Sequence, residues 1–434
     1  SVETFGCQMN VHDSERLSGL LENSGYELGD SADRLDLLVI NTCSVRERAA
    51  EKLFARLDRF RNKRLEARPT IAVTGCVAQQ EGEKILERAP VVDVIIGTQA
   101  IEKLPAAIES SKESGESYVD INPYDNVSFP LGVVKRKDSI KAYITIIEGC
   151  NDFCSFCVVP YTRGRERMRP ALEILEEAKE LAAGGCREVH LLGQIVNHYH
   201  APDIPGFDFP ELLQRLQAIS GIDRIRFASP HPRHVSARMI EAVATLPKVC
   251  KHMHLPVQSG STRVLSLMRR RHTRERYLSL IRDVRKQIPG INLSTDLIVG
   301  FPGETIDDFK DTLSLVREVR YHSIFSFKYS KRPQTLASQR MTETVSEDEK
   351  SNRLTELQAL QKKIQVSLHD QMVGRVCEVL VDSKSRRRDG EFCGRTNGNV
   401  IVNFPAGRNC IGKLVAVEII RTGPNSVWGK QVPS

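Results

Sequence analysis

The strongest constraint on the fold of this 434-residue chain is the alternation of short apolar runs with helical patterns. An apolar run short enough for a buried strand, followed by an amphipathic helix, predicts a parallel sheet with crossover helices. The pattern occurs three times before residue 90 and six times between residues 141 and 330. The chain is also too long for one ordinary hydrophobic core, so we expect two or three domains. The expected fold class is α/β, with a small β domain at the C-terminal end.

Residues 1–122 are predicted to form a Rossmann-like domain with a parallel sheet. Its strands are expected at residues 2–5, 35–40 and 70–73, and each is followed closely by a cysteine, namely Cys7, Cys43 and Cys76. Ligands of open α/β sheets lie beyond the carboxyl ends of the strands. The three thiols, although far apart in the sequence, could therefore meet at one point. Any one of these cysteines alone would more often be a small buried hydrophobic residue.

After a linker at residues 123–139, residues 140–366 are predicted to form a partial (βα)6 barrel. Strands are expected near residues 142–148, 188–192, 223–228, 252–257, 292–299 and 323–328, with helical patterns between them. Repeated βα units predict a barrel, or an open part of one, whose functional groups lie at the carboxyl ends of the strands.

The loop after the first of these strands carries three thiols, Cys150, Cys154 and Cys157. Cysteine thiolates usually hold a 4Fe-4S cluster through four ligands. A loop with three thiols would leave one iron with an open position, as catalytic zinc sites do. Spacing alone also leaves a zinc knuckle or buried free cysteines as alternatives.

Residues 367–434 change to a period of two. Short strands separated by Asp389-Gly390, Asn397-Gly398 and Gly423-Pro424 predict a small antiparallel β-barrel. From residue 370 onward the segment has 10 Lys and Arg against 6 Asp and Glu. This excess of positive charge is consistent with binding the phosphate backbone of RNA.

Charge and cysteine usage narrow the class of protein further. The net charge is +7, and basic residues crowd residues 263–286 and recur at 384–388, so phosphate backbones are expected partners. The eleven cysteines occur without a secretory signal pattern, which favours a reducing cytoplasm over disulfides. No apolar run reaches the length of about 18 residues that a membrane span requires, so membrane attachment is not expected.

Three stretches carry a resemblance to known families. Gly149 to Cys157, followed by Pro160-Tyr161-Thr162-Arg163-Gly164, resembles the cluster loop of radical S-adenosylmethionine (SAM) enzymes, and among them that of the methylthiotransferases. The stretch from Thr4 to Asn10, with Asp13-Ser14-Glu15 behind it, is similar to the opening of the methylthiotransferase N-terminal domain. The last segment resembles the TRAM domain of tRNA-modifying enzymes. Together these resemblances span essentially the whole chain.

The resemblance implies two 4Fe-4S clusters and a set of SAM contacts. Cys150, Cys154 and Cys157 would hold the cluster that cleaves SAM, and Cys7, Cys43 and Cys76 would hold an auxiliary cluster where a sulfur atom attaches and is methylated. The implied SAM contacts are Phe156, Gln194, Ser229, Gln258 and Asp296. The chain differs from the usual family sequence at two positions. Ile195 stands where an amide side chain is usual, and Gln334 stands where glycine is usual.

The implied reaction is methylthiolation of carbon 2 of N6-isopentenyladenosine beside the tRNA anticodon, with two SAM used per product. Cys7-Gln8-Met9-Asn10 matches the branch of the family that acts on this nucleoside. We further expect a cytoplasmic monomer that binds the anticodon stem-loop, receives electrons from a donor such as flavodoxin or ferredoxin, and obtains clusters from an iron-sulfur carrier.

Three alternatives stay open from the sequence. A sister methylthiotransferase would act on threonylcarbamoyl-adenosine or on a ribosomal protein. A zinc-bearing RNA-binding protein would have no catalytic cluster. A radical SAM enzyme that uses its second cluster only for electron transfer would make 5'-deoxyadenosine without a methylthio product.

Overall fold

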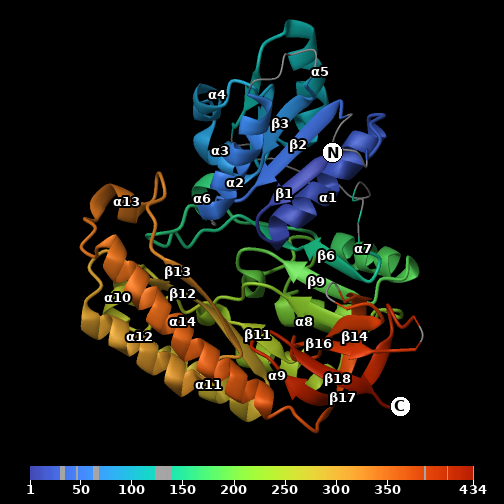
Figure 1. Cartoon of the computed structure of the whole chain (residues 1–434), viewed down its shortest axis with the longest axis vertical. Coiled ribbons are helices and arrows are strands. Elements are labelled where there is room, and N and C mark those ends of the chain that lie inside the picture. Colours follow the sequence, from blue (N-terminus) through green and yellow to red (C-terminus); the bar gives the residue numbers. More distant parts are fainter. Residues whose placement is uncertain are drawn as a thin grey trace.

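The structure is a computed structural model and describes residues 1–29, 35–44, 47–61, 68–122, 134, 136, 138–385, 388–407 and 409–433. An N-terminal sheet domain lies above a central open barrel, and a small β-barrel lies beside the lower end of that central barrel (Figure 1). Most of the predicted linker and the basic residues Arg386 and Arg387 lie outside the described residues. The domain boundaries at residues 122, 139 and 366 stay predictions.

The N-terminal domain is a three-layer parallel-sheet structure, as predicted. Its five strands lie in chain order: β1 (Val2–Phe5), β2 (Leu37–Thr42), β3 (Thr70–Thr74), β4 (Val94–Ile96) and β5 (Tyr118–Asp120). Helices α1 (Gln8–Asn23) and α5 (Leu104–Ser114) pack on one face of the sheet. Helices α2 (Glu47–Leu57), α3 (Cys76–Glu81) and α4 (Lys84–Arg88) pack on the other. The last two strands, of three residues each, are too short to give a pattern in the sequence.

The central domain is an open barrel of six parallel strands, which confirms the predicted class. In chain order these are β6 (Lys141–Thr145), β9 (Glu188–Leu192), β10 (Arg224–Phe227), β11 (His252–His254), β12 (Asn292–Val299) and β13 (Ser323–Lys328). Two groups of three strands are joined by a parallel bridge between Ile225 and Val249. Within the described residues β13 does not pair with β6, so the barrel stays open along these two edges.

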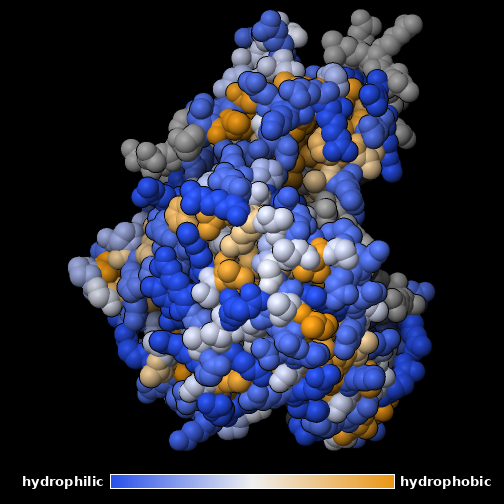
Figure 2. Space-filling model, turned by 90° about the vertical axis from the view of Figure 1, so that its left-hand side faces the viewer, coloured by the Kyte–Doolittle hydropathy of each residue, from blue (hydrophilic) through white to orange (hydrophobic). Residues whose placement is uncertain are grey.

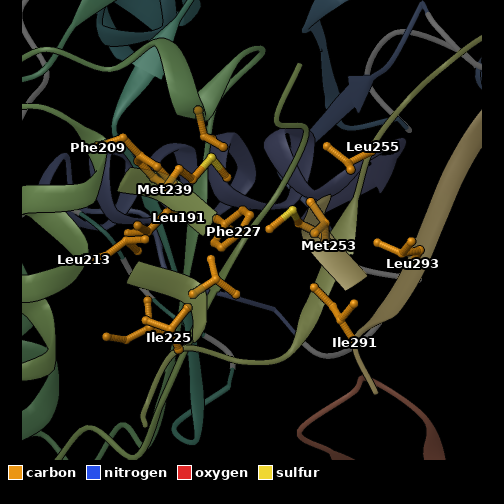
Figure 3. Close-up of a cluster of buried hydrophobic side chains, with 14 of the residues drawn as sticks. Leu191, Phe209, Leu213, Ile225, Phe227, Met239, Met253, Leu255, Ile291 and Leu293 are labelled. Atoms are coloured by element: carbon orange, nitrogen blue, oxygen red, sulfur yellow. The ribbon is translucent and has the colours of Figure 1, made fainter. Parts of the chain in front are cut away.

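Alternation along the strands gives the barrel an apolar outer face and a polar inner face. The outer face packs against helices α8 (Phe209–Gln217) and α9 (Ala237–Thr245), and Figure 3 shows part of this core around Leu191, Phe227 and Met253. The alternate residues of β9 are polar, and Nε2 of His190 lies 2.6 Å from the Glu188 carboxylate. Successive side chains of a strand point to opposite faces, so the two faces of the sheet can differ in this way.

The C-terminal domain is a closed barrel of five strands in the order β14-β15-β16-β18-β17. These are β14 (Val376–Lys384), β15 (Glu391–Thr396), β16 (Ile401–Pro405), β17 (Leu414–Thr422) and β18 (Val427–Gln431). The barrel is antiparallel as predicted, except that β16 and β18 pair in parallel.

The C-terminal barrel packs against the amino ends of the central strands. Arg224, at the start of β10, donates a hydrogen bond to the Glu378 carbonyl at 3.0 Å, and Asn292, at the start of β12, donates one to the Gly398 carbonyl at 2.7 Å. The side of the molecule shown in Figure 2 is mostly hydrophilic, with small separate hydrophobic areas. Within the described ranges no helix has the length and apolar content needed to cross a membrane.

Candidate active site

The three N-terminal cysteines lie at neighbouring strand ends, and their side chains interact. A hydrogen bond with Cys43 lowers the pKa of Cys7 to about 6, although burial opposes this effect. Cys76 is fully enclosed, so burial raises its pKa, and the nearby Cys7 adds to the rise. Gly6 permits the close approach of these strand ends, since a Cβ atom there would lie 2.6 Å from Cβ of Cys43. The predicted convergence of the three thiols is therefore present in the fold.

Arg163 joins this trio to the central domain. It follows the central cysteine loop by six residues, is only 5% exposed, and its positive charge acts to lower the pKa of the nearby Cys76 thiol, against the effect of burial. Its Nη2 atom lies 2.5 Å from Oδ2 of Asp13 on α1, and its carbonyl accepts a hydrogen bond from Gln99 at 3.3 Å. The N-terminal thiols consequently face the segment that carries the second set of cysteines.

Cys150, Cys154 and Cys157 lie in a tight loop at the mouth of the central barrel. Burial raises the pKa of Cys150 and of Cys157 to about 12, and the nearby Cys154 adds to both shifts. Gly149 begins the loop with φ +77°, and a Cβ atom there would lie 2.1 Å from the Arg165 carbonyl oxygen. Glycine is thus required for this close turn.

Arg270 is a site residue that the sequence analysis placed wrongly. It belongs to the basic run for which a phosphate partner was predicted, but it is 6% exposed. Its Nη1 atom donates to Sγ of Cys154 at 3.5 Å and its Nη2 atom donates to the Pro256 carbonyl at 2.7 Å. Arg263 and Arg274 of the same run also bind groups within the chain. Position in the run gave no signal that Arg270 turns inward.

The two sets of three cysteines can be compared with the two groups that such thiols bind in proteins, a zinc ion and an iron-sulfur cluster. In the part of the chain that the structure describes, no three His, Cys, Asp or Glu side chains are arranged to hold a single metal ion. A zinc ion needs each thiolate sulfur within about 2.3 Å of one point. A 4Fe-4S cluster places each thiolate on a different iron and spreads the sulfurs further apart. The donor set of each trio, three cysteine thiols, is one that iron-sulfur clusters use.

The five residues expected to contact SAM lie around the same mouth. Phe156 packs in a small apolar cluster with Met268, Phe301 and Tyr329. Gln194 follows β9, and its buried Oε1 atom has no hydrogen-bond partner. A buried acceptor without a partner is costly and fits a ligand that donates a hydrogen bond.

Ser229 and Gln258 have positive φ angles of 55° and 76°, which non-glycine residues rarely adopt. Such strain is concentrated at functional sites. Asp296 lies within β12 and not at its end, and its carboxylate is 3.3 Å from Nε2 of His254, a neighbour that the sequence analysis missed.

The structure also shows the surroundings of the two residues that differ from the usual family sequence. Ile195 is buried, with 5% of its surface exposed, so the change of an amide to an aliphatic side chain is accommodated by packing. Gln334 has a φ angle of +66°, which explains why glycine is usual at this position.

Comparison with known proteins adds three matches to family models. Residues 1–97 match "Uncharacterized protein family UPF0004", residues 144–316 match the radical SAM superfamily, and residues 370–432 match the TRAM domain. A protein of Geotalea uraniireducens named tRNA-2-methylthio-N(6)-dimethylallyladenosine synthase is 44% identical, over 99% of this chain and 98% of its own length. The chain belongs to this synthase family. A synthase of the same name from Bordetella petrii is 45% identical over 98% of this chain and 90% of its own length.

A solved structure shares the fold of this synthase family member. It is the radical SAM methyltransferase TsrM of Kitasatospora setae, with a TM-score of 0.57 at 14% identity, over 78% of this chain and 73% of that chain. The likeness supports the arrangement of a parallel-sheet domain on an open radical SAM barrel.

Proposed function

We propose that the chain transfers a methylthio group to carbon 2 of N6-dimethylallyladenosine in tRNA, as the name of its relatives states for them. The observation that carries the proposal is that the segment just after one cysteine trio contacts the domain that holds the other trio. Arg163 follows Cys157 by six residues, and its buried guanidinium pairs with Asp13 of the N-terminal domain and lies close enough to Cys76 to lower the pKa of that thiol. A reaction that needs a radical and a sulfur donor at the same carbon requires this proximity.

The six cysteines have assigned roles in this proposal. Cys150, Cys154 and Cys157 would hold the cluster that binds SAM, and Cys7, Cys43 and Cys76 would hold the auxiliary cluster. When bound, the two clusters supply reductive cleavage of SAM and a site for the transferred sulfur. The thiols that burial keeps protonated, Cys150 and Cys157, would be deprotonated by the metal, because the thiolate is the ligand form.

The protein surroundings tune and shield these sites. Arg270 donates a hydrogen bond to Cys154, which favours added negative charge at that sulfur. Arg163 places a buried positive charge beside Cys76, and Asp13 balances that charge. Gln194 would accept a hydrogen bond from the SAM ammonium group, since its Oε1 atom is buried and unsatisfied. Phe156, Ser229, Gln258 and Asp296 complete the proposed SAM site.

The partners follow from the same assignment. The C-terminal barrel would hold the tRNA backbone, and the anticodon stem-loop would bring the modified base to the mouth. Electrons would come from a flavodoxin or ferredoxin, and clusters from a carrier protein. We propose a cytoplasmic monomer.

Activity on defined tRNA tests the function directly. The anaerobically reconstituted chain should hold about eight irons and should methylthiolate prenylated tRNA but not unprenylated tRNA. Equal activity on both tRNAs, or product only on a threonylcarbamoyl-adenosine or ribosomal protein substrate, would overturn the assigned substrate. Zinc without acid-labile sulfide would overturn the enzyme assignment itself.

A further inference from the structure

An open groove lies beside the edge strand β13, where the central and C-terminal barrels meet. Its volume is about 460 Å³, and it is formed by β13, by α14 (Glu347–Asp370) and by the turn between β17 and β18. The residues that matter here are Phe325, Phe327, Gln358, Lys362, Gln365 and Asn425. None of these residues belongs to the two cysteine sites.

Two aromatic side chains on this strand are unusually exposed. Phe325 is 51% exposed and Phe327 is 38% exposed, whereas Phe301 and Phe309 in the same domain are almost fully buried. The Phe325 ring also contacts His254 edge-on at 5.7 Å, so it borders the polar interior of the barrel. Residues two apart on a strand share one face at a spacing of about 6.7 Å. That spacing is close to twice the separation of stacked bases, about 3.4 Å.

The polar lining of the groove favours a nucleic acid. No residue that lines the groove is acidic. Lys362 is exposed, and no ion-pair partner for it occurs among the described residues. The amides of Gln358, Gln365 and Asn425 offer both donors and acceptors, which suit base edges. Ser326, which alternates with the two phenylalanines, faces α14 and accepts a hydrogen bond from Gln358 at 3.3 Å, so the rings lie on one face of β13 and the cation and amides on the other. A single strand that crosses the open edge of β13 would meet both sets, which are the usual elements of a site for unpaired RNA.

The position of the groove supports the same occupant. The C-terminal barrel contacts the amino ends of the central strands, while the cysteine sites lie at their carboxyl ends. Strand β13 runs along the open edge between these two ends (Figure 1). Its six residues span about 20 Å. An RNA held by the C-terminal barrel would therefore pass over this edge on its way to the mouth.

We propose that the groove binds unpaired nucleotides of the anticodon loop that lie between the part held by the C-terminal barrel and the target adenosine. Their bases stack on Phe325 and Phe327, and a phosphate lies near Lys362. The inference rests on the proposed function and deepens it, because it names the side chains that hold the RNA substrate.

Binding of a prenylated anticodon stem-loop RNA to the reconstituted full chain tests this proposal. Phe325→Ala and Phe325→Leu should each raise the Kd about 5- to 150-fold, the range that corresponds to loss of one stacked base. Phe325→Tyr should bind as the unchanged protein does, because the ring is kept. Lys362→Gln should reduce the slope of log K against log salt by about 0.7, as expected for one phosphate of a single strand. The control is Leu172→Ala. The Leu172 side chain is 63% exposed on α7 (Ala171–Ala183), a helix that contributes no residue to the groove.

Each contrary outcome has a distinct meaning. If Phe325→Leu binds RNA as tightly as the unchanged protein, base stacking is wrong. If RNA binding is unchanged while Phe325→Ala slows reduction by flavodoxin, the groove binds a protein and the proposal is overturned. If the unchanged chain binds the RNA but makes no methylthio product, the proposed function fails. In that case the Kd values of the Phe325 and Lys362 variants alone decide whether the groove binds RNA.

Discussion

Arg163 Nη2 and Asp13 Oδ2 lie 2.5 Å apart, although 150 positions separate the two residues in the chain. Their side chains are 6% and 1% exposed, so this ion pair is buried between the N-terminal sheet domain and the mouth of the barrel. A buried pair contributes little net stability when intact, but removing one partner leaves an uncompensated charge. The pair therefore fixes how the two cysteine sites face each other.

Asp13→Asn is expected to destabilise the protein by about 3–5 kcal/mol, because Arg163 would stay buried without its counter-charge. Unfolding in urea should show this as a lower midpoint, and methylthio product should fall. The matched control is Asp307→Asn, which removes an ion pair with Lys310 whose side chains are 84% and 67% exposed. That exposed pair should contribute no measurable stability. A buried variant as stable as the control would contradict the role given to Asp13.

Cys154→Ala and Cys43→Ala should have different effects. The first should abolish 5'-deoxyadenosine formation, and the second should keep SAM cleavage but lose methylthiolation. Each variant should hold about four irons instead of about eight. Cys393→Ala, in the C-terminal barrel, is the control and should retain both products. Product from Cys43→Ala would show that the auxiliary site is wrongly assigned.

Much of this fold was readable from the sequence because its buried strands are short apolar runs that alternate with amphipathic helices. Such runs gave the positions of β9 and β12, and the ends of the first three strands gave the positions of Cys7, Cys43 and Cys76. Positions that depend on packing between distant segments were not readable. Arg270 resembles its exposed neighbours in the sequence, and only the fold turns it toward Cys154.

The partnership of His254 with Asp296 was missed for a related reason. Pairing of β11 with β12 sets the distance between them, and no local pattern encodes that register. The short strands β4 and β5 were missed because three residues cannot establish a period. The parallel pairing of β16 with β18 was missed because turn residues identify hairpins but not the closure of a barrel.

Arg270→Gln should make the reduction potential of the Cys154 cluster more negative. The guanidinium donates to the sulfur, and loss of a charged donor removes stabilisation of the reduced, more negative state. A hydrogen bond to a charged group of about 1.5–3 kcal/mol corresponds to a shift of about 60–130 mV for one electron. A redox titration followed by electron paramagnetic resonance measures the shift. Arg276→Gln, an exposed arginine nearby, is the control, and equal potentials for both variants would contradict the assignment.

His272 should make the fold sensitive to acid. Burial, helped by Arg270, lowers its pKa from 6.5 to about 4. The unfolded chain therefore binds a proton at higher pH than the folded chain, so stability is complete above about pH 6.5 and falls as the pH drops to about 4. One group with this shift accounts for up to about 3 kcal/mol. Urea unfolding at several pH values should show this slope. It should be shallower in His272→Phe, whose ring can keep the stacking on Tyr277.

Gln194→Leu should have opposite effects on stability and on SAM binding. Oε1 of Gln194 is buried without a partner, and an apolar side chain of similar size would remove that unsatisfied acceptor. The SAM-free protein should then gain about 1–3 kcal/mol in its free energy of unfolding. The Kd for SAM, measured by calorimetry on the reconstituted protein, should rise about tenfold, which corresponds to one lost hydrogen bond of about 1.4 kcal/mol. Gln194→Glu is the companion variant, since it keeps an acceptor and should keep SAM affinity. A purely structural glutamine would lose stability in the leucine variant and leave the Kd unchanged, which is the reverse of both expectations.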